Sequence, residues 1–238
     1  MSTKGLLARV FIPTAIFSLL YLLAGYIYPI PHLLLFFILA ALVLMPIELG
    51  IILNASKKEY GTWSLRSAFN GQKKIPVLQI LIIAFCFFGI AGLLSAFAAP
   101  VENGIVAGMR ETVLSWLPAG FDWTDFEYLR SFSRPTLVLT SVVYVVFNVF
   151  LCPITEELYF RGYLTSHYQK QNWFTPILIA ILFSLYHFWL PFHNIFRILA
   201  FAPVAYVSYR KKNFGISIVF HCLCNLFSTV SFIAAVFA

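Results

Sequence analysis

Long apolar segments alternate with short polar segments along the whole chain. Seven of the apolar segments carry little or no charge, and they approach the roughly 20 residues that a helix needs to cross a bilayer. We expect these spans at residues 11–28, 33–53, 75–99, 136 to about 160, 174–190, 195–209 and 214–237. Continuous apolar runs favour helices over the alternating pattern of membrane strands. The pattern therefore predicts an all-α polytopic bundle of about seven transmembrane helices.

The composition agrees with this pattern. Of the 238 residues, 61% are hydrophobic and 11% are charged, whereas soluble domains have about 45–50% and about 25%. This difference excludes a soluble protein. Lys and Arg outnumber Asp and Glu by 16 to 9, but they lie between apolar segments and do not form a basic stripe of the kind that binds nucleic acid. We therefore expect a lipid bilayer as the surroundings and no nucleic acid as a partner.

The basic residues also predict the orientation in the membrane. Twelve of the 16 fall on one side of the predicted spans, and loops rich in Lys and Arg stay in the cytoplasm. The N-terminus is then cytoplasmic, and short loops favour a prokaryotic cell membrane. The first apolar segment is longer than the core of a signal peptide, about 7–15 residues, and no small-residue cleavage site follows it. We expect this segment to remain as the first helix.

A long connection on the outer side divides the chain into two parts. Residues 1–135 hold the first three helices together with this connection, which covers residues 100–135, and residues 136–238 hold helices four to seven. The connection contains five acidic residues with scattered Trp and Phe. It is either a set of short amphipathic pieces on the membrane surface or an ordinary connector.

Three charged residues stand at the inner end of the fourth span. Glu156, Glu157 and Arg161 follow a long uncharged stretch, and a charge at a helix centre costs about 2.5–3.5 kcal/mol. Glu157 and Arg161 are four residues apart, so they can form an ion pair on one helix face. Glu156 lies about 100° further around the helix and can face a polar cavity. The alternative is a charged cap on a helix that ends near Arg161.

Two later spans carry isolated polar residues in apolar surroundings. Phe183 and His187 are four residues apart in the fifth span, and His221 and Asn225 have the same spacing in the seventh. This spacing puts each pair on one face of its helix. A single membrane His is an ordinary packing residue. The combination with Glu156 favours a site where polar groups from three helices converge.

These residues resemble the motifs of a known family. Residues 156–162, Glu-Glu-Leu-Tyr-Phe-Arg-Gly, resemble E-E-x-x-x-R-G, residues 183–187 resemble F-x-x-x-H, and residues 221–225 resemble H-x-x-x-N. The three motifs are those of the CPBP family, which holds the type II CAAX prenyl endopeptidases and the bacteriocin-processing or Abi-type membrane proteases. The resemblance covers residues 136–237. Three motifs in this order on successive helices form a specific signal.

The resemblance implies an intramembrane endopeptidase of the glutamate type, with residues 136–238 as its catalytic core. It implies that Glu156 is the general base that activates water, that His187 helps to hold this water, and that His221 and Asn225 stabilise the oxyanion. Three further residues would shape the site, namely Glu157, Arg161 and Phe183. It implies no cofactor and no metal ion. The partner would be a peptide or protein substrate presented from the membrane, prenylated in some members of the family.

The active-site hypothesis sets one condition on the fourth helix. His187 lies deep in its predicted span, whereas Glu156 lies near the inner surface. The two side chains can meet only if the fourth helix continues past Arg161 toward Lys170. This continuation would bury Arg161.

Other interpretations stay open at this point. Glu156, His187 and His221 form a possible metal set with one open position, although the chain has no H-E-x-x-H motif. A membrane scaffold, an immunity protein or a small transporter could use the same cluster to bind a partner or conduct protons. Glu48 either lines the cavity or reaches toward water, and Arg197 is expected to snorkel outward. The sequence leaves the oligomeric state and the natural substrate open.

Overall fold

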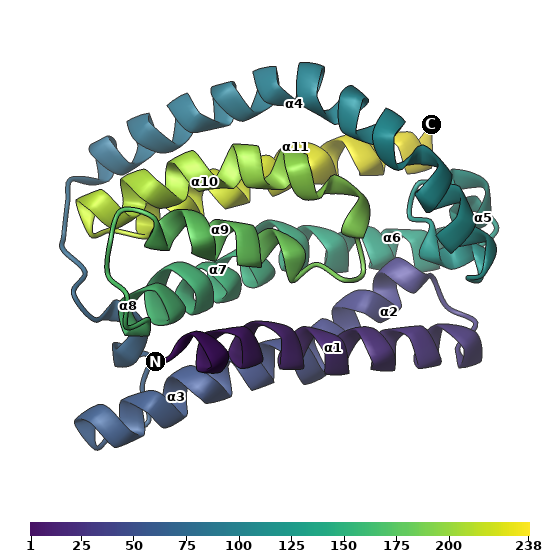
Figure 1. Ribbon diagram of the computed structural model, residues 1–238. Coiled ribbons are helices and arrows are strands. Elements are labelled where there is room, and N and C mark those ends of the chain that lie inside the picture. The colour runs from purple at the N-terminus through teal and green to yellow at the C-terminus, as the bar shows by residue number, and fades with distance from the viewer.

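The computed structural model describes residues 1–238, and every regular element in it is a helix (Figure 1). The elements are α1 (Thr3–Ile27), α2 (His32–Leu39), η1 (Ala40–Leu44), α3 (Met45–Tyr60), η2 (Arg66–Phe69), α4 (Val77–Ser115), η3 (Ala119–Phe121), α5 (Phe126–Arg130), α6 (Arg134–Tyr144), η4 (Val145–Leu151), α7 (Cys152–Glu157), η5 (Leu158–Leu164), α8 (Thr165–His167), α9 (Thr175–Leu185), η6 (Pro191–His193), α10 (Asn194–Lys211) and α11 (Gly215–Phe237). The all-α polytopic prediction is confirmed.

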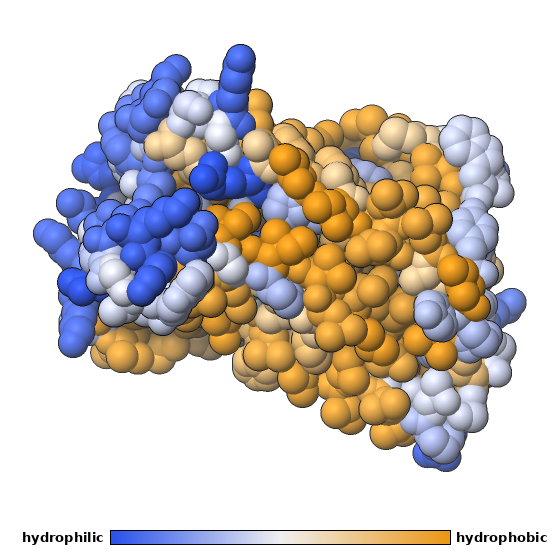
Figure 2. All heavy atoms as spheres, turned by 90° about the horizontal axis from the view of Figure 1, so that it is seen from below, coloured by the Kyte–Doolittle hydropathy of each residue, from blue (hydrophilic) through white to orange (hydrophobic).

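Five helices are long and apolar enough to cross a membrane. They are Thr3–Ile27, His32–Tyr60, Val77–Ser115, Arg134–His167 and Gly215–Phe237. Figure 2 shows the corresponding broad apolar band on the surface, with polar residues gathered at both ends. The five apolar helices and this band indicate an integral membrane protein.

One end of the bundle brings together segments that are far apart in the sequence. The amino group of Met1 donates a hydrogen bond to the carbonyl of His167 (2.6 Å), and the Lys73 amide donates to the carbonyl of Lys212 (2.7 Å). The N-terminus, the end of α3, α8 and the junction of α10 with α11 lie at this end (Figure 1). We call it the basic end, because most of the Lys and Arg residues belong to these segments and to the loops that adjoin them. Its assignment to the cytoplasm stays a prediction.

The fifth and sixth predicted spans differ in length from the long spans. α9 has 11 residues and ends at Leu185, so the predicted span 174–190 is too long. α10 has 18 residues and runs back toward the basic end. The two helices form a hairpin whose turn, residues 186–193, lies within the length of the bundle (Figure 1). The hydroxyl of Thr14, in the middle of α1, donates to the carbonyl of Tyr186 in this turn.

The turn is tolerated at this depth because other helices satisfy its backbone. Non-helical backbone inside a membrane requires burial in protein or a wet cavity. The carboxylate of Glu102 accepts hydrogen bonds from the amides of Ile195 and Phe196, both at 2.7 Å. These amides belong to the first turn of α10, which has no partners within its own helix. Glu102 in α4 therefore caps the returning helix of the hairpin.

The length of α4 corrects the prediction that residues 100–135 form a connection. α4 continues through Pro100 to Ser115, and η3 and α5 follow it, so most of the expected connection is helix. Pro inside a helix removes a backbone hydrogen bond and favours a break. Here the helix continues, and it brings Glu102 to the start of α10, where the side chain is 2% exposed. The local pattern predicts that the helix ends at Pro100. The helix instead continues, and the contact between Glu102 and the start of α10, which is distant in the sequence, accompanies this continuation.

Replacing Glu102 by Ala should lower the free energy of unfolding by about 1–3 kcal/mol, because two buried amides lose their acceptors. Thermal unfolding of the purified protein in detergent measures this loss. Glu111→Ala is the matched control, since Glu111 lies exposed on the same helix. Equal losses in the two variants would contradict the capping role.

The fourth predicted span is a single helix from Arg134 to His167. It continues past Arg161, which is 5% exposed. The continuation of the fourth helix that the active-site hypothesis requires is therefore present. Two π-helical segments, η4 and η5, interrupt its regular winding on either side of α7. Segments of this kind often occur at functional sites. Glu156 and Glu157 are the last two residues of α7, between them.

The glycine of the first motif has a packing reason. A methyl group added at Gly162 would lie 2.7 Å from the carbonyl oxygen of Ala68. The backbone of η2 therefore rests directly on η5. Any larger side chain at this position would push the two segments apart.

Candidate active site

A cavity of about 270 Å³ lies at the centre of the bundle. We call it the central cavity. Its walls come from α2, η1 and α3 on one side, from η4 and α7 on another, and from the ends of α9, α10 and α11. Aromatic side chains make up much of the lining, among them Phe36, Phe37 and Trp189. The polar lining residues come from α3, η4, α7, the turn after α9, α10 and α11, so polar groups from six segments converge in a largely apolar cavity.

The residues of the three sequence motifs meet at this cavity. Glu156, His187, His221 and Asn225 all line it, and so does Phe183. Glu157 and Arg161 do not line it, but they lie directly behind it. Side chains from α7, from α9 with the turn after it, and from α11 therefore converge at this cavity.

His221 stands between the two carboxylates. Its Nδ1 lies 3.1 Å from Oε1 of Glu157, and its Nε2 lies 3.8 Å from Oε2 of Glu156. The contact with Glu157 fixes Nδ1 as the donor and fixes the orientation of the ring. Nε2 consequently faces Glu156 and the cavity. This arrangement gives the two neighbouring glutamates different environments.

Glu157 and Arg161 form the ion pair that their spacing predicts. Nη1 of Arg161 lies 3.0 Å from Oε1 of Glu157, and the two side chains are 4% and 0% exposed. The guanidinium also lies over the ring of Phe183, 4.1 Å from its centroid. An aromatic face attracts a cation. The guanidinium of Arg161 is thus held by the carboxylate of Glu157 on one side and by the ring of Phe183 on another.

His187 lies in the turn after α9 and not within a helix, which corrects the sequence prediction. The helix ends at Leu185 because the chain turns there to enter α10. Nδ1 of His187 is 2.7 Å from the carbonyl of Phe183, so Nδ1 carries the proton and Nε2 is left free. The first and last residues of the F-x-x-x-H motif, Phe183 and His187, are therefore joined by a hydrogen bond at the end of α9.

Asn225 is fixed by a residue that the sequence analysis missed. Its side-chain amide donates to the carbonyl of Asn148 (2.8 Å) in the π-helical segment η4. The side chain of Asn148 donates in turn to Thr229 (2.9 Å). The available signal was an amide in an otherwise apolar span, two helical turns before Glu156.

Glu48 is a further carboxylate of this site. It is 1% exposed and lines the central cavity, so it does not reach toward water. The hydroxyl of Tyr186 donates a hydrogen bond to its Oε1 at 2.7 Å. Of the two interpretations given for Glu48, the cavity wall is the one observed.

Arg197 also lines the central cavity, so the expectation that it snorkels outward is wrong. Its Nη1 donates to the carbonyl of Ser184 (3.1 Å), and its Nη2 donates to the carbonyl of Leu190 (3.4 Å). The physical reason is the position of α10. This helix begins within the bundle and not at its surface, so a residue near its start points into protein.

The arrangement suits activation of a water molecule. A buried carboxylate faces an imidazole nitrogen, and side-chain donors surround the space between them. No group of three or more His, Cys, Asp and Glu residues has the geometry of a metal site in this structure.

Residues 138–227 match a family model described as type II CAAX prenyl endopeptidase Rce1-like. The matched segment is less than half of the chain, and it contains all three sequence motifs. No curated protein and no solved structure matches the chain.

Proposed function

Since residues 138–227 belong to the CPBP family of CAAX-type intramembrane proteases, we propose that this chain hydrolyses peptide bonds with water activated by Glu156. One observation carries the proposal. Glu156 faces Nε2 of His221 across 3.8 Å in a cavity that His187 and Asn225 also line. A base, a water-holding group and oxyanion donors are thus within reach of one small space.

The proposed reaction assigns one step to each group. Glu156 takes a proton from water as the hydroxide attacks the carbonyl carbon, and it later gives this proton to the leaving amine. His187, through its free Nε2, holds the water. His221 donates to the oxyanion from Nε2 when both of its ring nitrogens carry a proton, and Asn225 donates through its side-chain amide. Preorganised donors stabilise an oxyanion better than bulk water does.

The ion pair behind the cavity would act through His221. Glu157 accepts from Nδ1 of His221, which keeps the ring oriented toward the reacting atoms. Arg161 compensates the charge of Glu157, and its guanidinium packs against the ring of Phe183. The same logic orients the base in other hydrolases, where a buried carboxylate holds a histidine. Glu157 and Arg161 are therefore proposed to position the site without touching the substrate, and Phe183 supports Arg161 from the wall of the central cavity.

The proposed substrate is a peptide or protein presented from the membrane. The aromatic lining of the central cavity suits an apolar or prenylated segment. Residues 136–238 would form the catalytic core, and the part before them would complete the apolar wall through Phe36 and Phe37.

A cleavage assay tests the proposal. Purified protein is incubated with a quenched prenylated peptide and a panel of membrane-peptide precursors, with and without a strong chelator. Cleavage that survives chelation supports the glutamate mechanism. Loss on chelation that a divalent metal restores would instead support the metal set. If folded protein cleaves no peptide while it binds one of them, a partner-binding role replaces the proposal.

Replacing Asn225 by Ala should lower kcat by about 10²- to 10³-fold, the usual loss for one oxyanion donor. Steady-state kinetics measure this loss, and a melting curve separates it from the loss of the bond to Asn148. Ser228→Ala is the matched control, because Ser228 lines the same cavity one turn further along α11. Similar small losses in both variants would remove Asn225 from the mechanism.

A further inference from the structure

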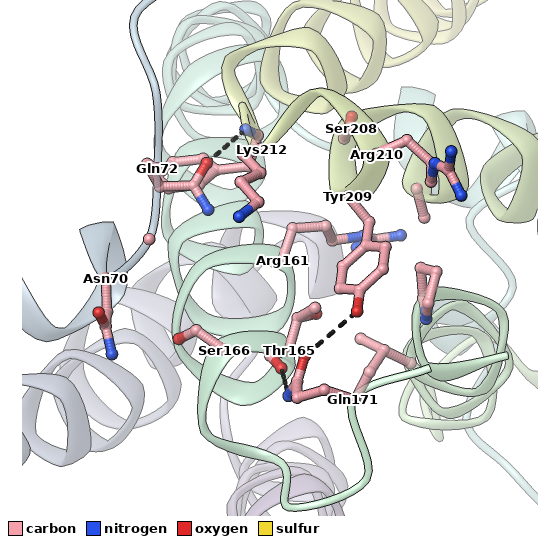
Figure 3. A pocket seen from close by; sticks show the side chains of 15 residues that line it. Asn70, Gln72, Arg161, Thr165, Ser166, Gln171, Ser208, Tyr209, Arg210 and Lys212 are labelled. Atoms are coloured by element: carbon pink, nitrogen blue, oxygen red, sulfur yellow. Dashed lines mark hydrogen bonds between the residues drawn. The ribbon is translucent and has the colours of Figure 1, made fainter. Parts of the chain in front are cut away.

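A second and larger pocket, of about 600 Å³, lies at the basic end (Figure 3). We call it the basic-end pocket. Its walls come from the loop after η2, from η5 and α8, and from α10 with the turn that follows it. It does not include any residue that lines the central cavity. The proposed reaction takes place outside this pocket, and Arg161 is the one lining residue that has a role in it.

The pocket has a strongly positive lining. Arg161, Arg210 and Lys212 contribute to its walls, and no Asp or Glu residue does. Arg161 is 5% exposed, whereas Arg210 and Lys212 are exposed. Figure 3 shows Arg161 extending into the pocket, with side chains of α10 and the following turn around it. The pocket thus has a buried cation inside and two solvated cations near its mouth.

Two buried groups at this pocket lack hydrogen-bond partners. Nε, Nη1 and Nη2 of Arg161 make no hydrogen bond, although Nη1 lies 3.0 Å from Glu157 in the ion pair. The hydroxyl of Ser208, a residue that is 3% exposed, has no partner either. Buried polar groups are nearly always paired. Unpaired donors that face a positively lined pocket indicate a ligand with several acceptor oxygens and a negative charge.

The walls of the pocket are already fixed by hydrogen bonds. The hydroxyl of Tyr209 donates to Oε1 of Gln171 (3.4 Å), and Nε2 of Gln171 donates to the carbonyl of Thr165 (2.8 Å). Both contacts are visible in Figure 3. They join α10 to the segment that follows α8. The space between Arg161 and the mouth is therefore preformed.

We propose that the basic-end pocket binds a phosphate-type oxyanion, carried by free phosphate or by the headgroup of an anionic phospholipid. Arg161 and Ser208 would hold its oxygens, and Arg210 and Lys212 would neutralise its charge. Guanidinium groups match phosphate oxygens in geometry and charge. The basic end is also where a cationic surface meets anionic headgroups.

The position of Arg161 connects this pocket to the central cavity. Its guanidinium lies over Phe183 and within 5.4 Å of the ring centroid of Phe201, and both rings line the central cavity. The anion would therefore share Arg161 with Glu157. The binding site itself does not depend on the proposed protease activity.

Binding is tested with the purified full chain in a neutral detergent. Inorganic phosphate and short-chain phosphatidylglycerol are titrated separately, and short-chain phosphatidylcholine and chloride at equal ionic strength serve as references. Phosphorus NMR line broadening and the shift in melting temperature report binding. Binding of phosphatidylglycerol alone identifies a lipid headgroup, and binding of both ligands shows that the phosphate group is sufficient. Either result supports the proposal.

Three variants locate the site. Arg210→Gln and Ser208→Ala should each weaken binding by about tenfold, as loss of a hydrogen bond to a charged ligand does. Lys211→Gln is the matched control, because Lys211 is exposed and lies outside the pocket. Ser208→Ala leaves the net charge unchanged, so it separates a defined site from general surface attraction. The proposal is overturned if neither ligand binds more tightly than the references, or if Lys211→Gln weakens binding as much as Arg210→Gln.

Discussion

Replacing Glu156 by Gln should reduce peptide cleavage to background, a loss of about 10²- to 10⁴-fold, as expected when a general base is removed. Gln has nearly the same shape as Glu and still accepts hydrogen bonds through its carbonyl oxygen. It cannot take a proton from water. The loss should appear in kcat, because the substrate-binding walls of the central cavity are unchanged. Single-turnover cleavage of the best substrate from the peptide panel measures it.

Glu48→Gln is the matched control for this prediction. Glu48 is a second buried carboxylate of the same cavity, and its hydrogen bond from Tyr186 can be kept by the carbonyl oxygen of Gln. We expect it to keep activity within about tenfold of the unmodified protein. The assignment of the base to Glu156 fails if Glu156→Gln stays active or if Glu48→Gln is the inactive variant.

Replacing Arg161 by Met should destabilise the protein by about 3–5 kcal/mol, because it leaves Glu157 buried without a counter-charge. Glu157 has no exposed surface, so water cannot replace the lost partner. Removing both charges, in Glu157→Gln with Arg161→Met, should recover much of the loss. Denaturant unfolding of the single and double variants in detergent gives the coupling energy.

Arg66→Met is the control for the arginine. Arg66 also lies over an aromatic ring, that of Tyr60 (4.4 Å), but it is exposed. Its replacement should change stability by no more than about 0.5 kcal/mol. Additive effects of Glu157→Gln and Arg161→Met would show that the two charges do not stabilise each other.

The long helices of the fold could be predicted from the sequence, because each is a continuous apolar run. The hairpin of α9 and α10 could not be predicted in the same way. The run 174–190 has no Gly, Pro or charged residue after Leu185, and the turn that follows α9 is held by a hydrogen bond from Thr14 and by the carboxylate of Glu102, which accepts from the start of α10. Those partners are many residues away, so a local pattern does not show them. The continuation of α4 through Pro100 was missed for the same reason.

The candidate site was predictable wherever a polar residue interrupts an apolar run. Glu156, His221 and Asn225 stand out in this way, and the fourth helix continues as their convergence requires. Arg197 was misplaced because its environment depends on where α10 begins in the bundle. Its inward position follows from the depth of the turn and not from its neighbours in the sequence.

The hairpin capped from α4 has a consequence for biosynthesis. The residues that satisfy its backbone, Thr14 and Glu102, are synthesised before the hairpin itself. When α9 and α10 leave the ribosome, their acceptor and donor groups therefore meet partners that are already in the bilayer. The central cavity acquires its last wall, with His221 and Asn225, only when α11 is inserted. Assembly of the site is thus coupled to the insertion of α11.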